Sequence, residues 1–267
     1  MRKITSKDNK YLKHAVSLKH KKYRMREQMF LLEGKKVVAE ALKKGIPLVR
    51  IMVDEAHCGD YQFLFEQYPQ AEWFLVDSRI FKYLADTETP QGIIALAGIP
   101  CYEFSMLLGR NNCLILLDQI ADPGNLGTII RTAWALNIDG ILLTEGCTDP
   151  FSPKVVRSSM GGILHVPVYT SVGLEHIEQL KSSGYKVAGT ALNAAASVFD
   201  GDYKGANIIV IGSESRGVSS HLLACCDSLI KIPINPEVDS LNAAIACAII
   251  MMEISKQRNV IPSSTRD

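Results

Sequence analysis

Short apolar runs alternate with helical patterns from residue 113 onward, and this alternation constrains the fold more than any other sequence feature. The runs are continuously apolar, which is typical of parallel strands covered by helices on both faces. They lie at residues 114–117, 141–144, 165–168, 186–190, 208–211 and 229–232. Helical patterns lie between or after them, at residues 126–136, 153–160, 174–183, 219–224 and 241–256. We therefore expect an α/β domain built on a parallel sheet.

The first hundred residues have a different rhythm, which predicts a smaller α/β unit. A helical stripe is expected over residues 30–42, with further helices at 63–68 and 78–84 and strands at 48–53 and 92–97. A Gly98–Pro100 break and a polar stretch at 109–112 follow. We place the boundary near residue 105, so that residues 1–105 form one domain and 106–267 the other.

Basic residues concentrate near the N-terminus. Residues 1–50 hold 15 lysines and arginines and four acids, a net charge of +11, whereas the other 217 residues hold 14 and 24, a net charge of −10. A charge run alone is most often a solvated helix face. This asymmetry favours nucleic acid instead, because clustered cations neutralise phosphates. The candidate RNA contacts are Lys21, Lys22, Arg24 and Arg26, with Arg157 further along the chain.

Several classes of protein are disfavoured by what the sequence lacks. The seven cysteines form no CxxC pair and no histidine stands at zinc-ligand spacing, so we expect a reducing cytoplasm and no metal. The apolar run at 243–252 is ten residues long, short of the roughly 20 that a membrane span requires. The charged first ten residues do not resemble a secretory signal.

Familiar nucleotide and nucleophile motifs are also missing. No GxGxxG follows a strand, and Val218 stands where a Walker A motif beginning at Gly212 would need its lysine. No GxSxG elbow is present, and the six histidines show no pairing typical of a triad or a zincin. Dinucleotide binding, NTP hydrolysis and hydrolysis by those nucleophiles are therefore not supported.

Three polar turns follow expected strands, at the edge where open α/β sheets bind ligands. Their sequences are DQIADPGNLGTIIRTA at 118–133, IGSESRGVS at 211–219 and IPINPEVDSLNAAIA at 232–246. Each has an ordinary explanation alone, because Asn125 and Ser240 are common helix-cap residues and Glu214 could pair with Arg131. The occurrence of all three turns in this order favours a functional site over three separate structural turns.

In that order the three segments resemble the three motifs of the SpoU, or TrmH-like, branch of the SPOUT RNA methyltransferases. The segment RSSMGGILHVPV at 157–168 also resembles the family pattern, and the resemblance spans residues 112–258. The N-terminal part, with FLLEGKKVVAEAL at 30–42, is similar to the substrate-binding domain often fused in front. That domain is like certain small RNA-binding ribosomal proteins.

The resemblance implies transfer of the methyl group of S-adenosylmethionine to a ribose 2′-hydroxyl of RNA, without a metal. It also implies a homodimer and a deep trefoil knot in the catalytic domain, an exception to the rule that chains avoid threading. The residues implied around the cofactor are Thr190, Ala191, Gly212, Ile232 and Leu241. The implied catalytic residues are Arg131, Asn125, Glu214, Ser240 and Asn242.

Transfer to a hydroxyl needs an aligned oxygen and removal of its proton. Arg131 is the family's proposed base, yet a guanidinium ordinarily stays protonated in proteins. We therefore expect Arg131 to be essential at the hydroxyl or its adjacent phosphate, and treat proton abstraction as a hypothesis. Glu214 and Asn125 would orient it, and Ser240 and Asn242 would hold the nucleotide.

The expected substrate is 23S rRNA, because the N-terminal part resembles that of relatives acting on large-subunit rRNA. A tRNA substrate, and an inactive RNA-binding factor for ribosome assembly, are the alternatives. A small-molecule methyltransferase would leave the basic segment without a purpose. The third motif departs from the family's usual glycine and glutamate at Pro236 and Asp239, and Pro236 has no backbone N–H to donate.

Overall fold

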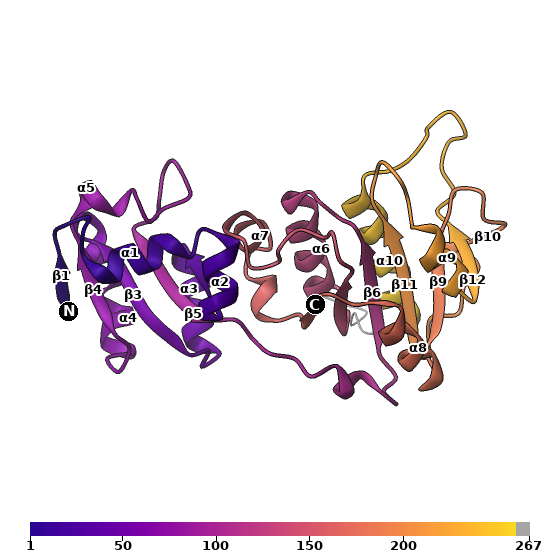
Figure 1. Cartoon of the computed structure of the whole chain (residues 1–267), viewed down its shortest axis with the longest axis horizontal. Helices are drawn as coiled ribbons and strands as arrows, with labels where there is room; N and C mark the ends of the chain where they lie inside the picture. Colours follow the sequence, from indigo (N-terminus) through magenta and orange to yellow (C-terminus); the bar gives the residue numbers. More distant parts are fainter. Residues whose placement is uncertain (260–267) are drawn as a thin grey trace, which may run out of the picture. The chain divides into compact units, whose positions relative to one another are not determined.

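In the computed structural model, which describes residues 1–259, the chain forms two compact units (Figure 1). The first contains residues 1–101 and 149–164, and the second contains residues 102–148 and 165–259. The boundary near residue 105 stays a prediction. Residues 149–164, which the sequence analysis placed in the C-terminal domain, group by their contacts with the first unit.

A seven-stranded parallel sheet lies at the centre of the second unit, which confirms the expected α/β fold. The strand order is β10-β12-β9-β11-β6-β7-β8. The strands are β6 (Cys113–Asp118), β7 (Gly140–Leu143), β8 (Val168–Tyr169), β9 (Lys186–Thr190), β10 (Ala196–Ser197), β11 (Asn207–Gly212) and β12 (Ser228–Lys231). Because all neighbouring strands are parallel, their carboxyl ends share one edge.

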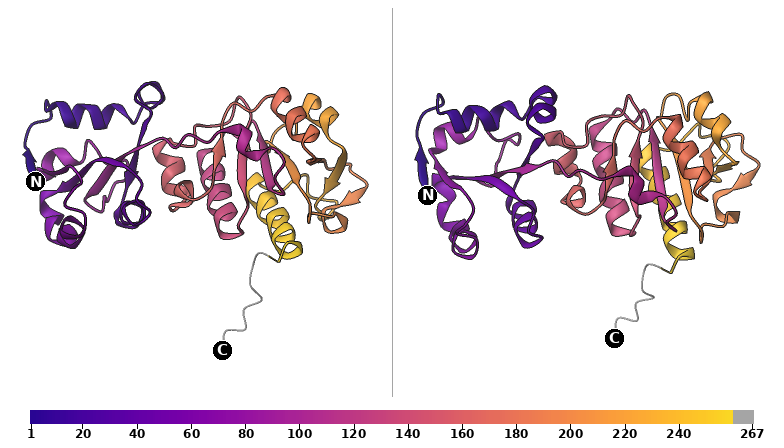
Figure 2. Two further views of the ribbon diagram at one scale, coloured as in Figure 1. Left: turned by 90° about the horizontal axis from the view of Figure 1, so that it is seen from below. Right: turned by 60° about the horizontal axis from the view of Figure 1, so that its bottom comes forward.

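Helices cover both faces of this sheet (Figure 2). They are α6 (Pro123–Ala135), α8 (Leu174–Ser182), α9 (Ser220–Cys225) and α10 (Ala243–Gln257), with short 3-10 helices η2 (Phe104–Leu107) and η4 (Val198–Asp200). Alternate strand residues such as Leu116 and Val210 share one hydrophobic core with Leu180 of α8 and Leu222 of α9. On the opposite face, α6 and α10 pack against each other. No helix within residues 1–259 is long and apolar enough to cross a membrane.

Two of these helices begin at polar residues of the motif segments. The Asp122 side chain caps α6 by accepting a 2.7 Å hydrogen bond from the Asn125 N–H, and Pro123 opens the helix. The Asn242 side chain caps α10 by accepting from Ala244 N at 2.9 Å and from Ile245 N at 3.3 Å. Local capping therefore fixes where the first and third motif segments turn into helices.

The first unit is built on a five-stranded mixed sheet in the order β1-β4-β3-β5-β2. Its strands are β1 (Arg2–Ile4), β2 (Met29–Glu33), β3 (Leu48–Asp54), β4 (Trp73–Val76) and β5 (Ile93–Gly98), and β5 runs antiparallel to both β3 and β2. Its helices are α1 (Lys10–Ser17), α2 (Lys21–Glu27), α3 (Lys35–Lys43), α4 (Gln62–Gln67), α5 (Ser78–Phe81), α7 (Pro153–Ser158), η1 (Glu55–Tyr61) and η3 (Gly162–Leu164).

Several sequence-based assignments were wrong in their extent, and two of them have a clear physical reason. The helical stripe expected over 30–42 begins with strand β2, because Gly34 at φ +111° breaks the chain between β2 and α3. The strand expected at 165–168 is reduced to Val168–Tyr169, which pairs with β7. Pro167 has no N–H for a ladder, which limits the strand on its N-terminal side.

Residues 149–164 complete the packing of the first unit. Helix α7 contacts β2, and the ring of Phe151 lies 5.1 Å from that of Phe30. The Lys44 ammonium donates a 2.8 Å hydrogen bond to the carbonyl of Leu164. The first unit is therefore discontinuous in sequence.

Candidate active site

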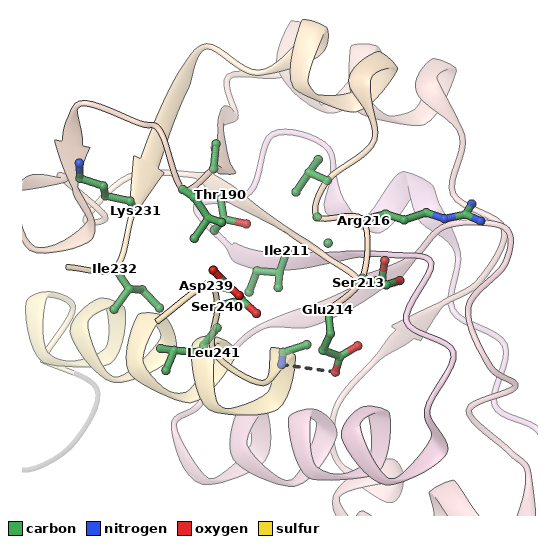
Figure 3. A pocket seen from close by; sticks show the side chains of 18 of the residues that line it. Thr190, Ile211, Ser213, Glu214, Arg216, Lys231, Ile232, Asp239, Ser240 and Leu241 are labelled. Carbon is green, nitrogen blue, oxygen red and sulfur yellow. Dashed lines mark hydrogen bonds between the residues drawn. The ribbon is translucent and has the colours of Figure 1, made fainter. Parts of the chain in front are cut away.

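A cavity of about 510 Å³ lies beside the carboxyl ends of β9, β11 and β12 (Figure 3). Its walls come from the loop after β9, the loop 213–218 after β11 and the loop between β12 and α10. The five residues that the resemblance places around the cofactor all line this cavity: Thr190, Ala191, Gly212, Ile232 and Leu241. Other apolar walls are supplied by Ile211, Val218 and Ile234.

The loop 213–218 folds back on the end of β11. The Gly217 N–H donates a 2.8 Å hydrogen bond to the carbonyl of Ser213, and Gly217 has φ +66°. A Cβ atom on Gly212 would lie 1.9 Å from the carbonyl carbon of Gly217, so only glycine fits at position 212. This close approach shapes the cavity wall.

A hydrogen-bond network joins the three motif segments. The Asn125 amide donates to Oε1 of Glu214, 89 residues away in the chain. The same Glu214 oxygen accepts from the Ala243 N–H at 3.4 Å, the dashed line in Figure 3. The Asn242 amide in turn donates to Oδ1 of Asn125 at 3.0 Å. Three loops far apart in sequence thus meet next to the cavity.

The remaining polar side chains divide between the cavity and its surroundings. Ser240 and Asp239 line the cavity, and Figure 3 shows their oxygens directed into it. Arg216 and Lys231 also belong to the lining, but their charged ends point away in the same view. Within residues 1–259, no group of three or more His, Cys, Asp or Glu side chains could hold a metal ion.

Arg131 lies away from this cavity. It is exposed on α6 and lines a second cavity of about 700 Å³ together with Thr128, Met252 and Glu253. Among the described residues, no hydrogen bond or ion pair joins Arg131 to Asn125 or Glu214, which bind each other instead. The structure therefore shows no direct contact through which these two side chains would orient Arg131, and that role stays a prediction.

The candidate RNA contacts in the first unit differ in their availability. Lys21 and Lys22 are exposed at the start of α2. Arg26 is exposed but bonds Glu27 at 2.6 Å and lies over the Tyr23 ring, 5.0 Å from its centre. Arg157 forms a 2.7 Å ion pair with Asp86, in which both side chains stay partly exposed.

Arg24 contradicts the prediction that it contacts RNA. Its side chain is only 4% exposed, and its guanidinium donates to Asp149 from Nε at 2.9 Å and from Nη2 at 2.6 Å. Its Nη1 donates to the carbonyls of Leu18 and Lys19, each at 2.8 Å. A guanidinium held in this way has no free edge for a phosphate, so Arg24 has a structural role.

Comparison with protein families agrees with this geometry. Residues 112–252 match the model of the SpoU rRNA methylase family. The chain belongs to this family. Residues 9–95 of the SpoU-family chain also match the MRM3-like substrate binding domain, which covers most of the N-terminal part.

Individual relatives match over nearly the whole chain. The SpoU-family chain is 33% identical over 255 residues to the 23S rRNA (guanosine(2553)-2′-O)-methyltransferase RlmP of Bacillus subtilis, covering 95% of this chain and 99% of that protein. An AdoMet-bound rRNA methyltransferase from Sinorhizobium meliloti is similar with a TM-score of 0.86 and 28% identity, over 96% and 97% of the two chains. The AdoMet complex of the SpoU methyltransferase AviRb from Streptomyces viridochromogenes also gives 0.86, with 26% identity over 94% and 98%.

Sequence reasoning missed parts of this site. It did not single out Arg216, Ile234 or Leu192 in the lining, because residues in loops leave no periodic signal. It also passed over Asp118, a buried carboxylate at the end of β6. The sequence did hold a signal for Asp118, because this acidic residue ends a continuous apolar strand. An acidic side chain that is buried at such a place nearly always has hydrogen-bond partners.

Proposed function

We propose that this protein transfers the methyl group of S-adenosylmethionine to a ribose 2′-hydroxyl in 23S rRNA. The observation that carries the proposal is the meeting of Asn125, Glu214 and Asn242 beside an apolar cavity. The name of the Bacillus subtilis relative and the AdoMet in two similar structures support the reaction and the cofactor. The MRM3-like domain and the exposed lysines of α2 support an RNA substrate.

The cavity suits the proposed cofactor in size and chemistry. Its volume of about 510 Å³ falls in the range of small-molecule sites, which is about 300–1,000 Å³. Ile211, Ile232 and Leu241 offer apolar surface for an adenine, while the carboxylates of Glu214 and Asp239 favour a cationic ligand. S-adenosylmethionine supplies an already activated methyl group when bound. We also propose that the loops around this cavity form the family's deep trefoil knot.

The chain's own residues would position the RNA and move the proton. Asn125, Glu214 and Asn242 hold one another, so the starts of α6 and α10 stay fixed relative to the cavity. Ser240 and Asn242 would hold the target nucleotide beside it. Arg131 would bind the hydroxyl or its adjacent phosphate, where a cation stabilises the developing alkoxide, and its action as the proton acceptor remains a hypothesis.

We propose a homodimer that closes over the face formed by α6 and α10. The second cavity on this face is largely apolar, and Phe199 and Met252 in its lining are 52% and 54% exposed. Exposed apolar surface of this kind is typical of a protein interface. A second copy would bury it and would place Arg131 at the subunit boundary. We further infer a cytoplasmic location and a reaction without a metal.

Two other functions would leave the same family features in place. A Synechocystis relative, 32% identical over 273 residues, is named as an uncharacterized tRNA/rRNA methyltransferase, so a tRNA 2′-hydroxyl is the alternative substrate. An RNA-binding assembly factor without transfer activity is the alternative of another class. The intact Asn125–Glu214–Asn242 network favours an active enzyme over that reading.

The test supplies the protein with labelled S-adenosylmethionine and separate pools of unmodified rRNA and tRNA, followed by mapping of the modified ribose. Label in 23S rRNA alone supports the proposal, label in tRNA alone supports the alternative substrate, and label in neither supports the binding factor.

Substitution of Arg131 tests the assigned chemistry. Arg131→Ala is expected to abolish transfer while cofactor binding, measured by calorimetry, stays within about threefold of wild type. The matched control is Arg110→Ala, because Arg110 is exposed in the same unit and lines neither cavity. An active Arg131→Ala protein would refute the assigned role.

A further inference from the structure

A buried carboxylate lies at the carboxyl end of the central strand β6. Asp118 is 2% exposed and pairs in register with Gly212 of β11, the residue that precedes the cavity loop 213–218. Its Oδ1 accepts a 3.1 Å hydrogen bond from the Thr144 hydroxyl, and its Oδ2 accepts a 2.8 Å hydrogen bond from the Ser219 N–H. The two oxygens therefore reach two different loops.

Of the two hydrogen bonds of Asp118, the one to Ser219 is next to the cavity. Ser219 directly follows the loop 213–218 and is the N-cap residue of α9. Its N–H donates to no other acceptor among the described residues, so the carboxylate is its partner. A hydrogen bond from a backbone N–H to a buried carboxylate is charge-assisted. Removing either partner leaves the other buried without a hydrogen bond, which destabilises the folded state.

The loop 213–218 is thereby held at three points. Its interior is closed by the Gly217–Ser213 backbone bond, and its Glu214 side chain bonds Asn125 and Ala243. The third point is its exit, where Ser219 is tied to Asp118. Every residue of this loop lines the cavity, so the exit bond sets where one wall stands.

We infer that Asp118 is a positioning residue for cofactor binding, acting through the Ser219 N–H on the loop 213–218. This inference rests on the proposed function, because the cavity is taken to hold S-adenosylmethionine. Asp118 does not line the cavity itself. Its other hydrogen bond, from the Thr144 hydroxyl, joins β6 to the end of β7 and takes no part in cofactor binding.

Proline at position 219 removes the N–H donor and puts its ring Cδ where the hydrogen was, so the Asp118 carboxylate can no longer approach this nitrogen. Ser219 has φ −62°, which matches the proline value of about −65°. Ser219→Ala is the matched control, because it keeps the N–H and removes only the hydroxyl, which contacts His221. Asp118→Ala removes the acceptor from the other side. Asp118→Asn is the conservative variant, since its Oδ1 can still accept from Ser219 while its amide donates to Thr144.

The experiment measures binding of S-adenosylmethionine by calorimetry at 20 °C, with RNA affinity and thermal unfolding followed on the same samples. Ser219→Pro and Asp118→Ala are each expected to weaken cofactor binding by about tenfold or more, which is about 1.4 kcal/mol. Ser219→Ala, Asp118→Asn and Thr144→Val are expected to stay within about threefold. RNA affinity is expected to change less than cofactor affinity in all five variants, since the exposed lysines of α2 remain in place.

The outcomes separate the two proposals. Wild-type protein that does not bind S-adenosylmethionine overturns the proposed function. Wild-type protein that binds it, with folded Ser219→Pro and Asp118→Ala proteins that bind equally well, overturns the positioning role. Equal weakening by Thr144→Val also overturns it, because the carboxylate would then act through general support of the strand ends. If Asp118→Ala does not fold, the comparison of Ser219→Pro with Ser219→Ala decides.

Discussion

Removal of the Arg24 guanidinium should destabilise the protein without affecting its binding of RNA. Arg24→Met keeps an unbranched apolar stem and removes all four hydrogen bonds to Asp149, Leu18 and Lys19. Asp149 is then left as a carboxylate whose side chain is only 9% exposed. Breaking a buried ion pair from one side costs about 3–5 kcal/mol, because the other charge stays desolvated.

The expected destabilisation is large enough to measure by thermal unfolding. At about 2–4 °C per kcal/mol for a chain of this size, Arg24→Met should lower Tm by about 6–20 °C. Asp149→Ala should also lower Tm, and the double variant should lose less than the sum of the two, with a coupling free energy of about 1–3 kcal/mol. Lys22→Met is the control, since Lys22 is exposed on the same helix and should change stability by less than about 0.5 kcal/mol.

For RNA binding, the two variants are expected to rank the other way: Lys22→Met should have the larger effect and Arg24→Met the smaller. Lys22→Met should weaken RNA binding and flatten its salt dependence, whereas folded Arg24→Met should bind RNA as wild type does. An Arg24→Met protein with an unchanged Tm and weakened RNA binding would show that Arg24 serves RNA and that the buried pair with Asp149 is not formed in solution.

Three further predictions concern the RNA surface, the subunit interface and the thiols. Neutralising Lys21 together with Lys22 should lower the slope of log affinity against log salt by about 0.7–0.9 for each phosphate that the protein no longer neutralises, and an unchanged slope would exclude α2 from the RNA interface. Met252→Glu should place a charge in the apolar α6/α10 face and shift the protein from dimer to monomer in sedimentation, whereas Glu253→Gln should not. Burial raises the pKa of the Cys113 thiol to about 12, so its thiolate fraction at pH 8 is very small, and mass spectrometry should find the exposed Cys58 and Cys101 alkylated first while Cys113 reacts only after unfolding.

The strands of the second unit were predictable because both faces of a parallel sheet are covered. Strands β6, β7 and β11 each contain a continuous buried apolar run that the sequence shows directly. Strand β1 was missed because Ile4 is its only apolar residue, and β10 was missed because it has two residues. In both cases the pairing comes from neighbouring strands rather than from a local pattern.

The sequence could predict which loops form the site, but it could not predict which side chains contact one another there. The order of the motif segments indicated that Asn125, Glu214 and Asn242 act together, and the structure joins them by hydrogen bonds. Sequence could not show that Arg131 faces a different cavity, since that depends on the rotation of α6. It also could not separate Arg24 from the lysines beside it, because a seven-residue helix is too short for its periodicity to identify the buried face.

The discontinuity of the first unit limits how this protein could exchange parts with others. A gene segment encoding residues 1–101 alone would leave out the carboxylate of Asp149 and the ring of Phe151, and so would expose the apolar side of β2. A recombination event at a single crossover would therefore separate Arg24 from its counterion. Transplanting this RNA-binding module onto another enzyme would require the host to supply its own version of residues 149–164, and a chimera assembled without it should misfold or aggregate.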